Sequence, residues 1–189
     1  MSNFLSKTEI EGIGFESYGE NLFISRDAKF YNPSRISLES DIRIDDFCIL
    51  SAGKRGIQIA SYVHIACFTS LIGKASITIG RFSNISARVS IYSSSDDYSG
   101  ESMTNPMVPE ELKKVHIAPV YIKDHVIIGC NTTVLPGVIM NQGAAIGAHS
   151  LVKSECKAFK IYAGIPAKII KDRKICLLSM VNKIMKAES

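Results

Sequence analysis

The chain has 189 residues, enough for one domain with a substantial core, and its net charge of +4 is a mild basic excess. Because no long basic run occurs, we expect no nucleic-acid partner. We see neither a signal peptide nor an apolar run long enough to span a membrane, so we expect no membrane span. The five cysteines form no CxxC pair, and free thiols in a reducing cytoplasm are the simplest expectation.

The first 21 residues carry little pattern, so we expect a short irregular or helical lead-in that covers an open end of the fold. From Leu22 an apolar residue recurs at every sixth position within successive groups. These residues are Ile24 and Phe30; Leu38, Ile44 and Leu50; Ile59, Ile65 and Leu71; and Ile79, Ile85 and Ile91. Between groups the step is eight or nine, and the additional residues lie in turn-rich stretches at 32–35, 53–56 and 73–76. We expect these stretches to bulge along one edge of the fold.

The repeat breaks between Tyr92 and Pro119. The intervening stretch is polar, contains Pro106 and Pro109, and keeps no sixth-residue register. We interpret residues 92–119 as a loop that leaves one corner of the fold. A loop of this length in a regular structure is usually functional or disordered, and a tolerated insertion is the alternative.

The clearest repeat occupies residues 120–153. Six positions spaced by six are all apolar: Ile122, Ile128, Val134, Met140, Ile146 and Val152. In a chain that is 46% hydrophobic, six such matches in one preset phase would occur by chance about one time in a hundred. A period of six fits neither an α-helix nor a flat strand, and an open flat sheet would not hold it for so long. It predicts an all-β solenoid in which three short strands make each triangular coil.

The pattern ends after Val152. The stretch AGIPAK at 163–168 indicates a tight turn, and the apolar spacing from Arg173 to Ala187 predicts a helix that caps or packs against the solenoid. The expected organisation is therefore a lead-in at 1–21, a β-helix at 22–153 with its loop at 92–119, and a C-terminal turn and helix at 154–189.

These motifs resemble those of the hexapeptide-repeat acyltransferases. The PV-x-I opening, the LPGV coil, the IGA-x-S-x-V-K coil and the AG-x-PAK turn occur in the order seen in the galactoside and xenobiotic acetyltransferase group. The segment SLESDIRIDDFCILSAG and the loop SSSDDYSG are similar to sugar acetyltransferases of bacterial O-antigen and capsule pathways, among them the N-acetyltransferases that act on dTDP-4-amino-4,6-dideoxyglucose. The resemblance implies a left-handed parallel β-helix, a homotrimer, acetyl-CoA as co-substrate, and active sites between subunits.

The resemblance also implies a coenzyme A site. By position, Cys130, Ala148, Lys153 and Lys168 match family residues that contact coenzyme A. The small Ala148 would admit the pantetheine arm, and Lys153, Lys168 and Arg173 would neutralise its phosphates. A backbone N–H near Gly129 or Gly147 is a candidate donor to the tetrahedral oxyanion.

The expected catalytic base departs from the family pattern. Relatives carry a His-Asp-Tyr-like motif at the start of the loop, where this chain has Asp96, Asp97 and Tyr98. A carboxylate with a pKa near 4 is a weak base for a sugar hydroxyl, whereas an amine is already nucleophilic in its neutral form. We therefore expect a nucleotide-linked 4-amino-4,6-dideoxy sugar as acceptor. The alternative is acetylation of a sugar hydroxyl with His116 as base.

Two other classes share this architecture. Gamma-type zinc carbonic anhydrases place three histidines across a subunit interface, but their two close histidines are nearer in sequence than His116 and His125 here. His64 and His149 are weaker candidates still, so we expect no metal. A noncatalytic solenoid scaffold is the second alternative, and the irregular loop and the AGIPAK turn argue against it.

Overall fold

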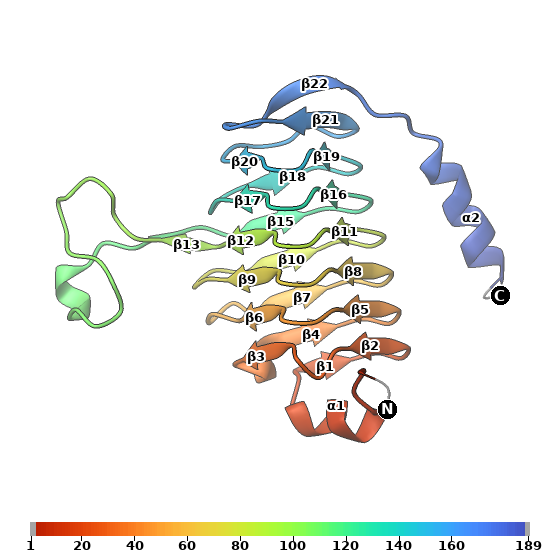
Figure 1. Cartoon of the computed structure of the whole chain (residues 1–189), viewed down its shortest axis with the longest axis horizontal. Coiled ribbons are helices and arrows are strands. Elements are labelled where there is room, and N and C mark those ends of the chain that lie inside the picture. Colours follow the sequence, from red (N-terminus) through yellow and green to blue (C-terminus); the bar gives the residue numbers. More distant parts are fainter. Residues whose placement is uncertain (1–2, 188–189) are drawn as a thin grey trace.

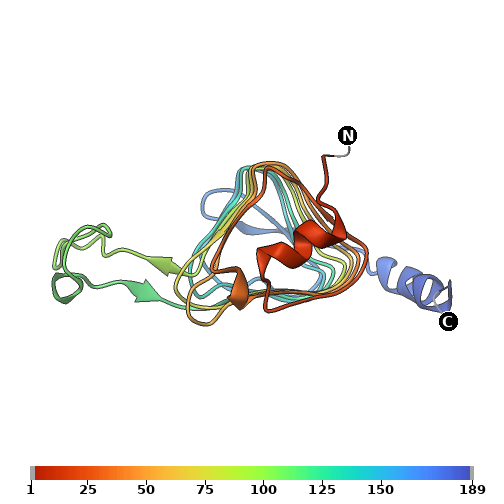
Figure 2. The same cartoon turned by 90° about the horizontal axis from the view of Figure 1, so that it is seen from below.

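The structure, a computed structural model, describes residues 3–187. It is a left-handed parallel β-helix of about seven turns, seen as a triangular column in Figures 1 and 2. Each side of the column is one parallel sheet, and successive strands in a sheet come from successive coils. The predicted fold class is therefore confirmed.

Each of the three faces is defined by its strands. The first face contains β1 (Ser17–Tyr18), β4 (Ile36–Leu38), β7 (Ile57–Ile59), β10 (Ile77–Ile79), β15 (Val120–Ile122) and β18 (Ile139–Met140). The second face contains β2 (Leu22–Ile24), β5 (Ile42–Ile44), β8 (Val63–Ile65), β11 (Asn84–Ile85), β16 (Ile127–Ile128), β19 (Ala145–Ile146) and β21 (Lys160–Ala163). The third face contains β3 (Lys29–Tyr31), β6 (Ile49–Ser51), β9 (Ser70–Ile72), β12 (Ser90–Tyr92), β17 (Thr133–Val134) and β20 (Leu151–Val152).

The column is filled by the residues that the sixfold spacing predicts. All of those positions are buried apart from Phe30, which is half-buried in the first coil. In most coils the residue two positions earlier is buried too, as with Ile57 before Ile59. Buried hydroxyl groups form hydrogen bonds; for example, the hydroxyl of Thr132 donates to the carbonyl of Gly147 at 3.2 Å. The interior is thus a stack of mainly aliphatic side chains.

Tight corners separate the second face from its two neighbours. Several corner residues with positive φ are aromatic, including Tyr62, Phe82 and His125. Their rings stack from coil to coil, with centroids 4.7 Å apart for Tyr62–Phe82 and 5.1 Å for Phe82–His125. Such stacking offsets the free-energy cost that a residue with a Cβ has in the left-handed conformation, a cost that glycine does not have.

The corner between the third and first faces carries the bulges. The stretches 32–35, 53–56 and 73–76 all lie between a third-face strand and the next first-face strand, as predicted. Residues 93–119, here called the loop arm, leave the same corner between β12 and β15 and project from the column in Figures 1 and 2. The buried Ser93 fixes the root of the arm by donating to the carbonyl of Ala75 at 2.8 Å. Gly73 permits this contact, because a Cβ there would lie 2.7 Å from the backbone nitrogen of Ser93.

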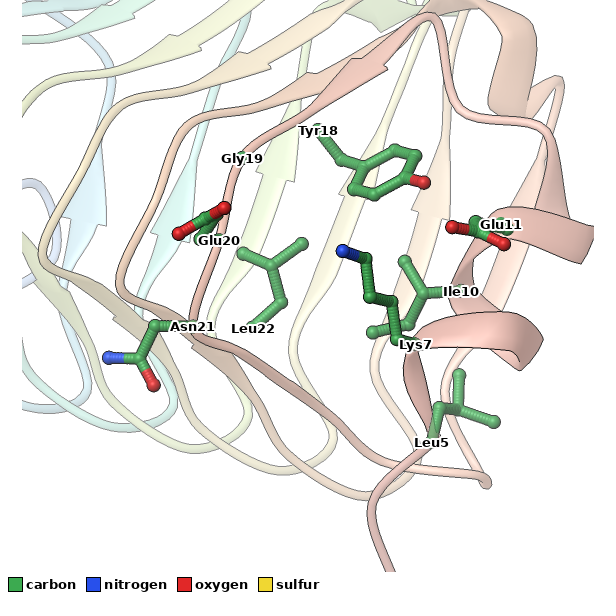
Figure 3. Close-up of a pocket in the computed structure, with 9 residues that line it drawn as sticks. All are labelled: Leu5, Lys7, Ile10, Glu11, Tyr18, Gly19, Glu20, Asn21 and Leu22. Atoms are coloured by element: carbon green, nitrogen blue, oxygen red, sulfur yellow. The ribbon is translucent and has the colours of Figure 1, made fainter.

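The N-terminal end of the column is covered by α1 (Lys7–Ile13). A capping box between Ser6 and Glu9 starts this helix, which buries Ile10 over the first coil. The cover is incomplete: a hollow of about 680 Å³ remains between α1 and the first coil, and Figure 3 shows its lining, with Lys7 contributed by α1 and Tyr18 by β1. The hollow exists because no further coil lies below the inward-facing Tyr18.

The column extends past the predicted boundary at the C-terminal end. β21 pairs in parallel with β19, so the second face continues beyond residue 153, and β22 (Lys168–Asp172) folds back on β21 through the AGIPAK turn. The helix α2 (Leu177–Ala187) stands beside the column in both views and does not cap it. Within residues 3–187, neither helix has the length and apolar character that crossing a bilayer requires.

Candidate active site

The stem of the loop arm brings the two candidate bases close together in the backbone. β13 (Ser94–Ser95) pairs antiparallel with β14 (His116–Ile117), and Ser95 lies directly opposite His116. Asp96 follows Ser95, so it stands one position from the residue paired with His116. Successive side chains on a strand point to opposite faces, which separates the carboxylate from the imidazole. Both side chains are exposed.

Asp96 lines a hollow of about 240 Å³ in the loop arm, here called the loop pocket, and His116 does not. The lining residues are Lys74, Ser94, Ser95, Asp96, Asn105, Pro106, Glu110, Lys113 and Val115. Glu110 belongs to the single turn of 3₁₀ helix η2 (Glu110–Leu112), and Lys74 comes from the bulge of the preceding coil. Of the two rivals, Asp96 is therefore the one that faces a site with charged and polar neighbours.

Asp97 is engaged by the backbone and side chains of the loop arm. Its carboxylate accepts from the backbone N–H of Ser99 and from the hydroxyl of Ser102, both at 2.9 Å. These hydrogen bonds, those from Ser99 first, lower the pKa of Asp97 from 3.8 to about 2. A carboxylate that is so strongly stabilised as an anion is a poor proton acceptor, so its geometry fits a loop-ordering residue.

Four predicted site residues gather at one corner, between the second and third faces: Cys130 and Ala148, expected to contact coenzyme A, and Gly129 and Gly147, expected to offer a backbone donor to the oxyanion. The N–H groups of the two glycines are not free for that role, because Gly129 donates to the carbonyl of Ile146 at 2.8 Å and Gly147 to that of Tyr162 at 2.7 Å. Gly129 and Cys130 follow β16, and Gly147 and Ala148 follow β19 one coil later. A Cβ on Gly129 would lie 2.5 Å from the backbone nitrogen of Ala148, so this glycine is required by the spacing of the coils themselves. Ala148 is exposed and Cys130 is half-buried. We call these four residues the small-residue flank, and its low relief fits a slender chain such as pantetheine.

The three predicted phosphate-binding residues differ in their surroundings. Lys153 follows β20 and Lys168 begins β22, and both are exposed at the C-terminal end of the column. Arg173 instead ties the C-terminal segment to a corner, because its Nη1 donates to the carbonyls of His125 at 2.8 Å and Gly143 at 3.0 Å. Burial lowers the pKa of Arg173. Arg173 therefore stabilises the position of the C-terminal segment against the column.

The other histidines lie apart from the loop arm. His64 is 2.8 Å from the carboxylate of Asp45 on the second face, while His125 is stacked at a corner, where burial lowers its pKa. His149 lies 3.3 Å from the Asn131 amide. Within residues 3–187, no three His, Cys, Asp or Glu side chains are grouped closely enough to hold a metal ion. All five cysteines are free thiols, and burial raises the pKa of Cys48 and Cys156 to about 11.

Sequence reasoning missed the charged residues of the loop pocket. Lys113 and Glu110 lie in a stretch that has no repeat register, and Lys74 lies in a turn interpreted only as a bulge. The available signal was positional: Lys74 stands in the last bulge before the loop arm leaves the column, at the same corner. That coincidence predicts contact between the bulge and the arm, but not the identity of the arm residues it meets.

The parallel triangular column with an extruded arm is the fold of the left-handed β-helix acyltransferases. The chain is 51% identical over 177 residues, or 94% of its length and 92% of the relative's, to the dTDP-4-amino-4,6-dideoxy-D-glucose acyltransferase of Escherichia coli. It therefore belongs to the same family of hexapeptide-repeat acyltransferases and is itself an acyltransferase. No protein-family model matches the sequence.

Two further relatives show how far the likeness extends. Structures of AntD, an N-acyltransferase from Bacillus cereus, superpose with a TM-score of 0.95 at 40% identity over 99% of both chains, in complex with dTDP-4-amino-4,6-dideoxyglucose and coenzyme A. Another AntD complex contains dTDP and 3-hydroxybutyryl-CoA. WbbJ of Escherichia coli K12, named as a lipopolysaccharide biosynthesis O-acetyl transferase, is 35% identical over 61% of this chain and 57% of its own. The predicted family resemblance is confirmed.

Proposed function

We propose that the protein transfers the acetyl group of acetyl-CoA to the amino group of a nucleotide-linked 4-amino-4,6-dideoxy sugar. The observation that carries this is the position of Asp96 on the loop pocket, where a carboxylate stands at the expected place of the base and the only competing histidine of the arm, His116, lies outside the lining. The names of the Escherichia coli relative and of the AntD complexes support the same acceptor.

The chemistry of an amine acceptor suits a carboxylate. The neutral amine attacks the thioester carbonyl, a C–N bond forms, and the C–S bond breaks to release the thiolate of coenzyme A. The proton lost by the nitrogen ends on that thiolate, so the site needs a group that orients the amine more than a strong base. Asp96 accepts a hydrogen bond from the amine and stabilises the positive charge that develops on nitrogen during attack.

The spacing of two residues supports a site shared between subunits. AntD has been crystallised with substitutions at a serine and at an aspartate ten residues further along, and Ser86 and Asp96 stand ten residues apart in this chain. Ser86 follows β11 at the corner next to the small-residue flank, whereas Asp96 lies on the arm that leaves a different corner. A site that uses both residues, and coenzyme A as well, is most simply built from two copies, as in the homotrimer that we propose.

The donor would lie along the small-residue flank. Cys130 and Ala148 present little bulk to the pantetheine arm, and the exposed ammonium groups of Lys153 and Lys168 lie at the C-terminal end of the column, where they can pair with the phosphates. The product would enter the synthesis of an O-antigen or capsule, and we expect the reaction in the cytoplasm, where coenzyme A and sugar nucleotides are made. The WbbJ relative supports the polysaccharide context.

The test supplies acetyl-CoA with two acceptors that differ only at one atom: dTDP-4-amino-4,6-dideoxyglucose and its 4-hydroxy counterpart. We expect acetylation of the amine at a kcat/KM at least about a hundredfold above that of the hydroxyl, because the neutral amine is the better nucleophile. Acetylation of the hydroxyl alone would support O-acetylation with His116 as base. Sedimentation velocity of the same preparation tests the trimer, and a monomer that is fully active would contradict a shared site.

A further inference from the structure

Two lysines in the loop pocket share one carboxylate. The Nζ of Lys113 lies 2.8 Å from one oxygen of Glu110, and the Nζ of Lys74 lies 3.7 Å from the other. The two ammonium groups, Lys113 first, lower the pKa of Glu110. The carboxylate therefore occupies a position where two positive charges converge from different parts of the chain, the arm and the preceding bulge.

The burial of these groups is strongly uneven. The side chain of Lys113 is only 5% exposed, whereas that of Glu110 is 75% exposed. An enclosed ammonium group requires an anion beside it, and here the anion is on a solvent-facing side chain of a single 3₁₀ turn. A carboxylate held in this way can swing into solvent at low cost, provided that another anion replaces it.

The site between Lys74 and Lys113 that Glu110 occupies, here called the anion seat, lies in the same pocket as Asp96. Both line the same hollow of about 240 Å³, which is below the usual range of roughly 300–1,000 Å³ for ligand pockets and is too small for a whole sugar nucleotide. In a 4-amino sugar nucleotide, the amine and the diphosphate are attached to opposite sides of one pyranose ring. A sugar whose amine meets Asp96 thus extends its diphosphate one ring away, and within this pocket the cationic groups are Lys74 and Lys113.

We propose that Lys74 and Lys113 hold the diphosphate of the acceptor, and that Glu110 occupies their seat as an internal counter-ion until the substrate displaces it. This inference rests on the proposed function, since it takes the acceptor to be a nucleotide sugar. The backbone of Lys74 is held against the arm stem, because its N–H donates to the hydroxyl of Ser94 at 3.3 Å. The bulge at 73–76 thereby acquires a function in addition to its role as a turn.

Binding of dTDP and of thymidine, measured by isothermal titration calorimetry, tests the seat. Lys113→Met and Lys74→Met are expected to weaken dTDP binding about tenfold or more, in line with the loss of a charge-assisted hydrogen bond, and to leave thymidine binding unchanged because thymidine has no phosphate. Lys114→Met is the matched control, since Lys114 is next in sequence, 74% exposed, and pairs with Glu101 at 3.5 Å. Lys113→Arg should keep dTDP binding near the wild-type value.

Glu110→Gln is expected to raise the affinity for dTDP, whereas the lysine variants lower it. This variant therefore distinguishes a phosphate-binding site from a salt bridge that only holds the arm in place. Without the competing carboxylate, dTDP should bind several-fold more tightly, whereas a structural tie predicts weaker binding through a disordered arm. Unchanged dTDP binding in both lysine variants, or weaker binding in Glu110→Gln, would overturn the inference while leaving the proposed function intact. Failure of the wild-type protein to bind dTDP and to acylate the amino sugar would overturn both.

Discussion

The column and the loop arm are held together by different interactions. In the column, Ile85 is fully buried between Ile65 of the coil before and Ile128 of the coil after, and every coil repeats this arrangement. In the arm, the contacts are local hydrogen bonds and ion pairs, such as those of Asp97 and of Glu110. Burial of apolar area dominates the first region and local polar geometry the second.

This difference separates stability from chemistry along the chain. The column supplies a rigid frame whose surface can carry a flank of small residues, while the arm carries the charged groups that we propose bind the acceptor. Substitutions in the column should therefore act on the free energy of unfolding, and substitutions in the arm on turnover.

The largest effect is expected in the column. Ile85→Ala leaves a cavity in a stack that cannot collapse without shifting whole coils, so the free energy of unfolding should fall by about 2–5 kcal/mol in urea denaturation. Leu112→Ala in the arm, where the side chain is 50% exposed, should change it by no more than about 0.5 kcal/mol. Equal losses in the two variants would show that the arm is an integral part of the core.

The next effect is expected in the arm and on turnover alone. Asp96→Asn keeps the shape of the side chain but removes the charge that orients the amine, so kcat should fall about a hundredfold or more, with the urea midpoint unchanged. His116→Ala should retain most of the activity, because the imidazole lies outside the lining of the loop pocket. Loss of turnover in His116→Ala alone would reverse the assignment of the two residues.

A smaller effect is expected at the small-residue flank of the column, where we propose that the donor binds. Ala148→Leu adds bulk to the exposed flank, so the KM for acetyl-CoA should rise about tenfold while the affinity for dTDP stays the same. Ala148→Gly, which adds no bulk, should leave the KM near the wild-type value. A rise in KM for both variants would point to a change in the corner backbone and not to obstruction of the donor.

The sequence predicts the column well, because its sixfold period is imposed by one repeated physical demand, an apolar side chain directed into a narrow prism. The corner ladder of Tyr62, Phe82 and His125 could not be predicted in this way, since its rings meet only through stacking between coils. The pairing of β21 could not be predicted in this way either, because it continues the second face without continuing the sixfold apolar phase.

The candidate site follows the same division. Asp96 could be found from its place at the start of the loop, and the small residues of the flank from their place in the repeat. The ion pairs of Glu110 with Lys74 and Lys113 could not be found from the sequence. Lys74 lies in a bulge of the column, and the other two residues lie in a part of the arm that has no periodic pattern. Similarly, nothing in the sequence indicates that Arg173 is tied to the carbonyls of a distant corner.

The smallest effect concerns the order of the arm as a function of pH. The pKa of Asp97 is about 2 in the folded arm against an ordinary value of 3.8, so its hydrogen bonds stabilise the arm above about pH 4 and are lost as the pH falls towards 2. Amide hydrogen exchange at Ser99, corrected for the intrinsic rate, should lose its protection over that interval, and Asp97→Asn should remove the pH dependence. The amide of Gly129, bonded to the carbonyl of Ile146 at 2.8 Å in the column, should stay protected throughout. Loss of protection at both amides together would mean that the arm and the column unfold as one unit, which would contradict the separation between them.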